Sequence, residues 1–214
     1  MHAVVVKRIA MSAIAAVSLA AAGLGAPGQA AQPAHAQEPG MGAAQPGLTL
    51  MAEDLPAGYV EHSLPMQIGP MQGEVKVFVA RGEQRRPWFV ESATLTGQSV
   101  LVDPTETSAM VRAFRRSFAA NGGLQVDDWA ERDPGALGER AVMYSFRYRP
   151  DETDDSPSAS LPDGDGAVIF FERGTTLSIL VVLDTQGRAQ DHLRRYASIV
   201  DARMAQAAPA GPAA

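Results

Sequence analysis

The fold is decided by the segment Ala167–Leu183, which reads AVIFFERGTTLSILVVL. It contains two almost uninterrupted apolar runs, AVIFF and LSILVVL, and the residues Arg173 and Gly174 lie between them. A short polar connection between two such runs is typical of a β-hairpin. Strands that are apolar on both faces lie inside a sheet and are covered on both sides. The segment therefore predicts two central antiparallel strands with a further layer on each face.

The other strands are predicted upstream of this hairpin. Pro65 interrupts the first of them, and residues 69–73 form a turn before the second. In the last of them, Tyr144, Phe146 and Tyr148 line one face. Alternating or extended patterns place these strands at Tyr59–Ile68, Glu74–Ala80, Trp88–Thr96, Leu124–Arg132 and Arg140–Arg149.

Two amphipathic helices are predicted, and each has a clear apolar stripe. The first begins at Asp103 as N-cap, with Pro104 in the first helical position and Glu106 completing a capping box. It ends at Asn121-Gly122-Gly123, and the second helix spans Arg188–Met204. The stripes consist of Met110, Val111, Phe114 and Phe118 in the first helix and of Ala189, Leu193, Tyr196, Ala197, Val200 and Met204 in the second.

These elements predict an α+β domain. Strands come first, then a helix, then antiparallel hairpins and a final helix. Central strands that are apolar on both faces need a layer on each side, and the two helices supply these layers. We therefore expect a three-layer α/β/α sandwich around a mainly antiparallel sheet.

The N-terminus predicts export from the cytoplasm. Lys7 and Arg8 precede the apolar run Ile9–Leu24, and Ala34-His35-Ala36 matches the small-x-small pattern of a signal peptidase site. We expect cleavage after Ala36, with Gly28-Gln29-Ala30 as a second site and an uncleaved signal anchor as the alternative. The protein is then periplasmic or secreted.

The expected domain organisation follows from composition. Residues 1–36 form the signal peptide, 37–47 a disordered linker, 48–204 a single α+β domain, and 205–214 a disordered tail rich in Ala, Pro and Gly. Residues 151–166 are predicted to be an acidic loop insertion within the domain. The mature chain keeps 178 of 214 residues, enough for one well-buried core.

Composition excludes several classes of function. The chain has no cysteine, which rules out disulfides, thiol catalysis, zinc-thiolate sites and a lipid-modified N-terminal cysteine. Loss of Lys7 and Arg8 takes the formal net charge from −6 to −8, which disfavours nucleic acid and anionic lipid as partners. We expect no nucleic-acid partner and no stable membrane insertion after cleavage.

A family resemblance lies at the start of the folded domain. Leu48–Tyr59, LTLMAEDLPAGY, is a short leucine-rich turn that leads into D-L-P-x-G and an aromatic residue. It resembles many exported bacterial proteins of unknown role, which continue with a mid-chain helix, a segment similar to Gly135–Ala141, an apolar strand pair and a C-terminal helix. The resemblance implies a PsbP/Mog-like fold and a non-catalytic accessory role. It brings no catalytic residues, and the missing cysteine departs from the lipid-anchored members of that family.

The acidic stretch Asp151–Gly166 holds six carboxylates in sixteen residues. An EF-type calcium loop needs oxygen ligands at alternating positions and a closing glutamate, and neither Asp151 nor Asp163 starts such a register. The stretch is interrupted by Pro157 and Pro162, which favours a solvated loop. A calcium site of another type and docking to a basic partner remain alternatives.

Catalytic signals are weak. The mature chain retains only His62 and His192, and no G-x-S-x-G is present. Asp127 and Asp128 precede Trp129, an aromatic residue that could stack on a sugar. Neighbouring strand residues point to opposite faces, so these two acids are not expected to converge on one substrate. We predict no catalytic residues, no metal and no cofactor, and the sequence favours a protein that is not an enzyme.

The most site-like cluster is formed by Arg85, Arg86 and Trp88. Paired guanidinium groups can hold a carboxylate or a phosphate, and an indole ring can stack on one of them. The alternative is a charged turn with Trp88 in the core. We expect a non-catalytic binding or accessory protein of the cell envelope, with an unknown protein or small molecule as its partner. A secreted hydrolase using carboxylates and an interaction module docking through the acidic loop or the C-terminal helix are the alternatives.

Overall fold

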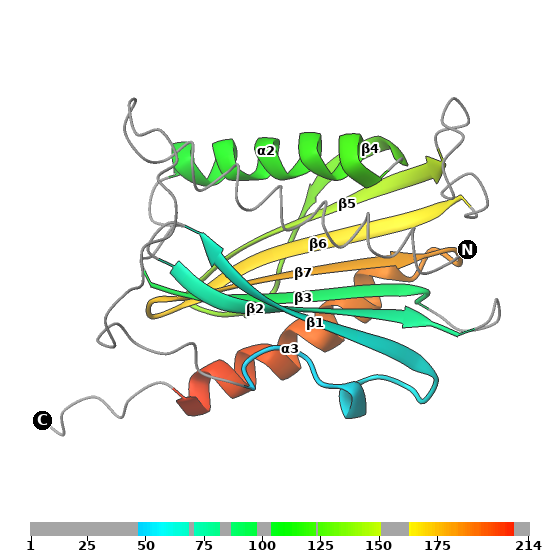
Figure 1. Cartoon of the computed structure of the whole chain (residues 1–214). Helices are drawn as coiled ribbons and strands as arrows, with labels where there is room; N and C mark the ends of the chain where they lie inside the picture. Colours follow the sequence, from blue (N-terminus) through cyan, green and yellow to red (C-terminus); the bar gives the residue numbers. More distant parts are fainter. Residues whose placement is uncertain are drawn as a thin grey trace, which may run out of the picture.

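The computed structural model describes residues 47–68, 71–81, 87–97, 104–122, 124–150 and 163–207. Within these ranges the chain forms one seven-stranded sheet, with strand order β1-β2-β3-β7-β6-β5-β4, in which all neighbours are antiparallel (Figure 1). The strands are β1 (Tyr59–Ile68), β2 (Met71–Ala80), β3 (Phe89–Thr96), β4 (Leu124–Arg132), β5 (Arg140–Pro150), β6 (Gly164–Arg173) and β7 (Thr176–Asp184). The helices are η1 (Ala52–Asp54), α2 (Pro104–Gly122) and α3 (Ala189–Ala207). The fold is therefore of the α+β type, as the sequence predicts.

The predicted hairpin forms the inner part of the sheet. β6 and β7 pair through residues such as Ile169 opposite Leu180, and Gly174 makes the turn with a positive φ of 59°. β3 pairs on the other side of β7, and β5 on the other side of β6. Residues of β6 and β7 are buried on both faces, which explains their nearly continuous apolar sequence.

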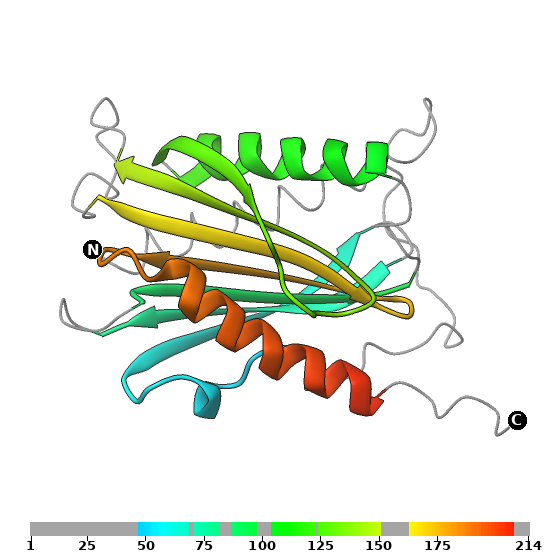
Figure 2. The same ribbon diagram turned by 180° about the vertical axis from the view of Figure 1, so that it is seen from behind.

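The two helices pack on opposite faces of the sheet. α2 shares a core with Val168, Phe170 and Val181, whereas α3 shares a second core with Ile169 and Leu180 (Figures 1 and 2). Alternate residues of the same strands therefore serve the two cores, because side chains along a strand point alternately to either face. Below, these are called the α2 face and the α3 face.

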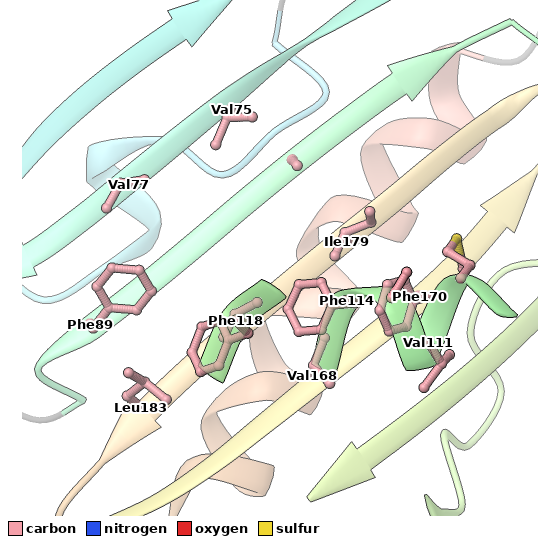
Figure 3. Packing of buried hydrophobic residues seen from close by; sticks show 14 of the residues in the cluster. Val75, Val77, Phe89, Val111, Phe114, Phe118, Val168, Phe170, Ile179 and Leu183 are labelled. Atoms are coloured by element: carbon pink, nitrogen blue, oxygen red, sulfur yellow. The ribbon is translucent and has the colours of Figure 1, made fainter. Parts of the chain in front are cut away.

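The α2 core is built on aromatic contacts. The ring of Phe114 lies edge-on to Phe170 of β6, with centroids 5.4 Å apart, and stacks on Phe118 at 5.6 Å (Figure 3). Phe118 in turn meets Phe146 of β5 at 5.7 Å. All four predicted stripe residues of this helix are buried, as are the six of α3. The stripes read from the sequence are confirmed, and α2 lies over β5 and β6.

Several boundaries differ from the expected ones. β1 continues through Pro65, which pairs with Glu74; this is possible because β1 is an edge strand, where a missing N–H faces solvent. β2 begins at Met71 instead of Glu74, and α3 extends to Ala207. Residues 164–166, predicted as the end of the acidic loop, belong to β6. Residues 151–162 and the predicted N-cap Asp103 lie outside the described residues.

The D-L-P-x-G motif ties the start of the domain to its last helix. Asp54 receives two hydrogen bonds from the guanidinium group of Arg203 in α3, at 2.7 and 2.8 Å. Leu55 is buried in the α3 core, and Gly58 adopts a positive φ of 103° before β1 begins. Among the described residues, no helix is long and apolar enough to cross a bilayer.

Candidate functional site

An open polar groove lies at the end of the sheet where β4 and β6 begin and β5 ends. Its volume is about 660 Å³, and a second hollow of about 290 Å³ adjoins it through the shared residues Asp128, Arg147 and Asp165. The groove is lined by Asp127, Asp128, Arg147, Tyr148, Arg149, Asp163, Gly164, Asp165 and Thr185. Charged side chains thus dominate its walls.

The groove exists because α3 does not cover the whole face. α3 packs over β6 and β7 and leaves part of β4 and β5 open on its face (Figure 2). The residues of β5 that point to this open area include Ser145 and Arg147, whereas Phe146 and Tyr148 point into the α2 core. The strand alternation of β5 therefore places polar residues on the uncovered side.

A row of charged residues crosses four strands at the groove. In the sheet register Asp127 of β4 lies opposite Arg147 of β5, Arg147 opposite Asp165 of β6, and Asp165 opposite Asp184 of β7. Directly opposite residues of antiparallel strands point to the same face, with their Cβ atoms about 5 Å apart. The row therefore holds three carboxylates and one guanidinium group on the α3 face.

Two ion pairs neutralise part of this charge. Arg149 Nη2 lies 2.5 Å from Asp127 Oδ2, and Arg147 Nε lies 3.8 Å from Asp165 Oδ1. The second distance exceeds that of a hydrogen bond. Among the described residues, Asp128 and Asp163 take part in no hydrogen bond or ion pair. The groove therefore retains acceptors that its own arginines do not occupy.

A β-bulge brings Asp127 and Asp128 to the same groove. The pairing of β4 with β5 shifts between Asp127 and Ala130, and Asp128 has a positive φ of 51°. An extra residue at a bulge breaks the strict alternation of side chains along a strand. The expectation that these two acids cannot face one site is therefore wrong. A glycine, the usual signal of such a bulge, is absent at this position, so the bulge could not be predicted from the sequence.

At the inner end of the row, polar atoms are buried without partners. Asp184 is fully buried; its Oδ2 accepts hydrogen bonds from the backbone N–H groups of Gln186 and Arg188, at 3.3 and 3.0 Å, just before α3 begins. Its Oδ1 and Thr185 Oγ1 are buried with no hydrogen-bond partner in the described part of the chain. Thr185 also lines the groove.

Of the predicted site residues Arg85, Arg86 and Trp88, the structure describes Trp88, which does not line the groove. Arg85 and Arg86 lie outside the described residues. Trp88 is half-buried against the α2 core, and its Nε1–H donates to the hydroxyl of Tyr148 at 2.5 Å. Tyr148 is the link between Trp88 and the groove, which it also lines. Trp88 is thus held in place by its contacts with the α2 core and with Tyr148.

The remaining candidates for chemistry do not gather at the groove. His62 is exposed on the edge strand β1, whereas His192 lies in α3. Burial lowers the pKa of His192, against a smaller opposite effect of Asp184. Trp129 stacks on Phe146 and Tyr144, with centroids 5.0 and 5.4 Å away, so its ring belongs to the α2 face. A sugar bound in the groove would not reach it.

The described part of the chain shows no metal centre. Within the described ranges, no three His, Cys, Asp or Glu side chains converge so that they could hold a metal ion. Comparisons with family models, curated proteins and solved structures gave no match to this chain. The groove itself therefore provides the basis for a functional proposal.

Proposed function

We propose that this chain is an exported, soluble, non-catalytic binding or accessory protein of the cell envelope, and that the groove on the α3 face is its binding surface. The observation that carries the proposal is the set of unused acceptors in the groove. Asp128 and Asp163 are unpaired, and Thr185 Oγ1 is buried without a partner among the described residues. A concave site with a few such polar groups is a common form of small-ligand site.

The proposal also includes a structural relationship to the PsbP/Mog-like fold. The helices on opposite faces of one antiparallel sheet support a three-layer sandwich of the PsbP/Mog-like kind. The D-L-P-x-G motif has a structural role here, since Asp54 and Leu55 attach the first turn to α3. Export is supported by the N-terminal sequence alone.

A binding role agrees with the exposure of the groove carboxylates. The side chain of Asp127 is 52% exposed and paired with Arg149, and that of Asp165 is 39% exposed. A carboxyl group that acts as a general acid near neutral pH needs a desolvated environment, which raises its pKa. These exposed groups are suited to recognising charge.

The test is a titration of the full ¹⁵N-labelled chain with a panel of polar small molecules, followed by amide chemical shifts. The panel contains amino acids, diamines, sugars, dicarboxylates and sugar phosphates. We expect at least one compound class to shift resonances of the groove residues, and Asp163→Asn to weaken that response. The matched control is Glu53→Gln in η1, which also removes one negative charge and lies at an exposed position. Absence of any groove response across the panel would contradict the proposal.

A secreted hydrolase is the second candidate, and the bulge favours it. Asp127 and Asp128 line one groove, so two carboxylates do meet there. Two-carboxylate hydrolysis needs one group to act as acid and the other as base or nucleophile. Turnover of chromogenic glycosides or esters that Asp128→Asn abolishes would establish this function. We expect no turnover by the parent protein or by Asp128→Asn.

A further inference from the structure

We propose that the inner end of the groove, between Asp165 and the segment Asp184–Thr185, is a binding site for a guanidinium group. This inference rests on the proposed function, since it names the class of ligand that the same groove accepts. The site lies where β6, β7 and the start of α3 meet.

Negative charge exceeds positive charge around Asp165. Asp165 and Asp184 are directly opposite on neighbouring strands, and like charges in such a position repel each other. Arg147 lies on the other side of Asp165, and its Nε is 3.8 Å away, too far for a hydrogen bond. The carboxylate of Asp165 therefore keeps the capacity to accept hydrogen bonds from a further cation.

Independently of charge, polar atoms beside Asp165 have unused hydrogen-bonding capacity. Asp184 is fully buried, and only its Oδ2 is engaged in the described structure, by two backbone amides. Thr185 Oγ1 is buried and unpartnered too, and Thr185 lines the groove. A buried acceptor without a donor is costly, and native structures normally satisfy such groups. Thr185, which lines the groove, therefore offers a buried acceptor to a donor-rich group bound there, whereas Asp184 is fully buried and lines neither hollow.

Asp165 also lies close to the loop that joins β7 to α3. A Cβ atom built on Gly187 would lie 3.4 Å from Asp165 Oδ2, so this carboxylate reaches the loop between β7 and α3. The loop is the same one that contains Thr185. The acceptors of Asp165 and Thr185 therefore border one end of the groove, with the side chain of Asp184 on the same face.

The chain's own cations do not satisfy these atoms. The backbone N–H of Arg188 bonds to Asp184, but among the described residues no side-chain bond joins Arg188 to Asp184 or Asp165. His192 lies close enough to Asp184 for their charges to interact, yet no hydrogen bond joins them in the described structure, and burial disfavours its protonated form. Arg149 is engaged by Asp127.

A guanidinium group fits this arrangement better than a metal ion or an ammonium group. The carboxylates do not converge on one point, as a metal ion requires, whereas guanidinium has five N–H donors spread in a plane. It can pair with a carboxylate through two parallel bonds and still donate to a hydroxyl. The guanidinium group can belong to a free small molecule or to an arginine side chain of a peptide.

The experiment measures binding to the full chain by calorimetry and by amide chemical shifts. L-Arginine is compared with L-citrulline, which has the same shape without the charge, and with L-lysine. Agmatine and the peptide acetyl-Gly-Arg-Gly-amide distinguish the two sources of the group. We expect arginine to shift resonances at Asp165 and Thr185, citrulline to have no effect, and lysine to bind at least several-fold more weakly.

Variants test the assigned atoms. Asp165→Asn should weaken binding of arginine about tenfold or more, because it removes a charge-assisted bond. Thr185→Val should weaken it several-fold, and Glu53→Gln should leave it unchanged. Asp184→Asn is informative only where its spectrum remains folded, since Asp184 also accepts two amides at the start of α3. The side chain of Asp165 is partly exposed, so Asp165→Asn should leave the protein folded. This variant therefore keeps the test decisive.

Several results would overturn the proposal. Equal binding of citrulline would show that charge is irrelevant, and equal binding of lysine would remove the preference for guanidinium. If no guanidinium compound affects the groove while another compound of the panel does, the ligand class is wrong and the proposed function stands. If nothing in either experiment affects the groove, both proposals fail.

Discussion

Glu91 lies in the interior strand β3 and is only 2% exposed. Its register partners on either side are Val77 and Val181, both in the α2 core. Its Oε2 is buried without a hydrogen-bond partner in the described structure. Burial therefore raises the pKa of the Glu91 carboxyl well above its usual value of 4.5.

This raised pKa predicts a dependence of stability on pH. The folded state holds the Glu91 proton more tightly than the unfolded state does, so the contribution to stability is complete below about pH 4.5. It is lost as the pH rises through the pKa of the folded state. We expect Glu91→Gln, which cannot ionise, to be more stable than the parent at pH 8 and to lose this advantage towards pH 4.5. Urea denaturation of the full chain at several pH values measures the difference.

The control is Glu172, which is equally buried but has Arg140 at 3.9 Å. The charge of this carboxylate has a nearby compensating cation. We therefore expect no gain in stability from Glu172→Gln at pH 8. A Glu91→Gln protein that is no more stable than the parent at any pH would show that the carboxyl is solvated or paired.

Phe114 is the second residue whose substitution has a clear expected effect. It is fully buried and contacts both Phe118 of its own helix and Phe170 of β6. Phe114→Ala should lower the free energy of unfolding by about 3–5 kcal/mol, the usual cost of truncating a buried phenylalanine. Chemical denaturation of parent and variant measures this. Arg112→Ala, at an exposed position of the same helix, should cost less than about 1 kcal/mol.

At the scale of elements, the link between η1 and α3 is a local device that holds the first turn of the domain. Arg203 donates two hydrogen bonds to Asp54 and a third to the carbonyl of Thr49, at 2.9 Å. The side chains of Arg203 and Asp54 are 23% and 10% exposed. Loss of the guanidinium group leaves a mostly buried carboxylate without its partner, which is costly.

We therefore expect Arg203→Met to destabilise the protein by about 1–3 kcal/mol, a range that allows for partial exposure. Hydrogen exchange should quicken in residues 48–55 more than in the sheet, because the first turn loses its attachment. Arg195→Met is the matched control on the same helix, where the side chain is exposed. Equal effects of the two substitutions would contradict a specific role for the D-L-P-x-G aspartate.

The sequence predicted those elements whose signals are local. The apolar runs of β6 and β7 and the stripes of α2 and α3 depend on hydrophobic period alone, and all of them were found. The extension of β1 through Pro65 was missed because tolerance of proline depends on the strand's position at an edge. An edge position is a property of the sheet, which the local sequence does not contain.

The groove could not be predicted for the same reason. The row from Asp127 to Asp184 depends on the register of four strands, whose residues are up to 57 positions apart in the chain. The bulge at Asp128 then changes the side to which one acid points. The local sequence instead favours Arg85, Arg86 and Trp88, because they lie within four positions of one another in the chain.

At the scale of the whole molecule, the offset of the helices accounts for the position of the groove. α2 packs over β5 and β6, and α3 packs over β6 and β7 on the other face. β6 is therefore covered by a helix on both faces, whereas β4 and part of β5 are open on the α3 face. The charged row lies in this open area, where its side chains keep contact with solvent.

The whole chain also carries a prediction about export, which concerns residues outside the described structure. Two cations, a 16-residue apolar run and Ala34-His35-Ala36 follow one another in the order of a cleavable signal. The apolar run is shorter than the roughly 20 residues that a membrane-spanning helix needs. We expect the exported protein to begin at Gln37, and intact-mass measurement of protein from the extracytoplasmic fraction determines this.

The alternatives give different masses and locations. Cleavage after Ala30 would add the six residues 31–36, and an uncleaved anchor would retain Met1 and remain with the membrane. Ala36→Leu places a large side chain where the peptidase requires a small one, so it should shift or block processing. Ala43→Leu, a similar change downstream of the predicted site, should have no effect. A membrane-bound chain that starts at Met1 would refute the prediction and would place the folded domain, with its groove, at the membrane surface.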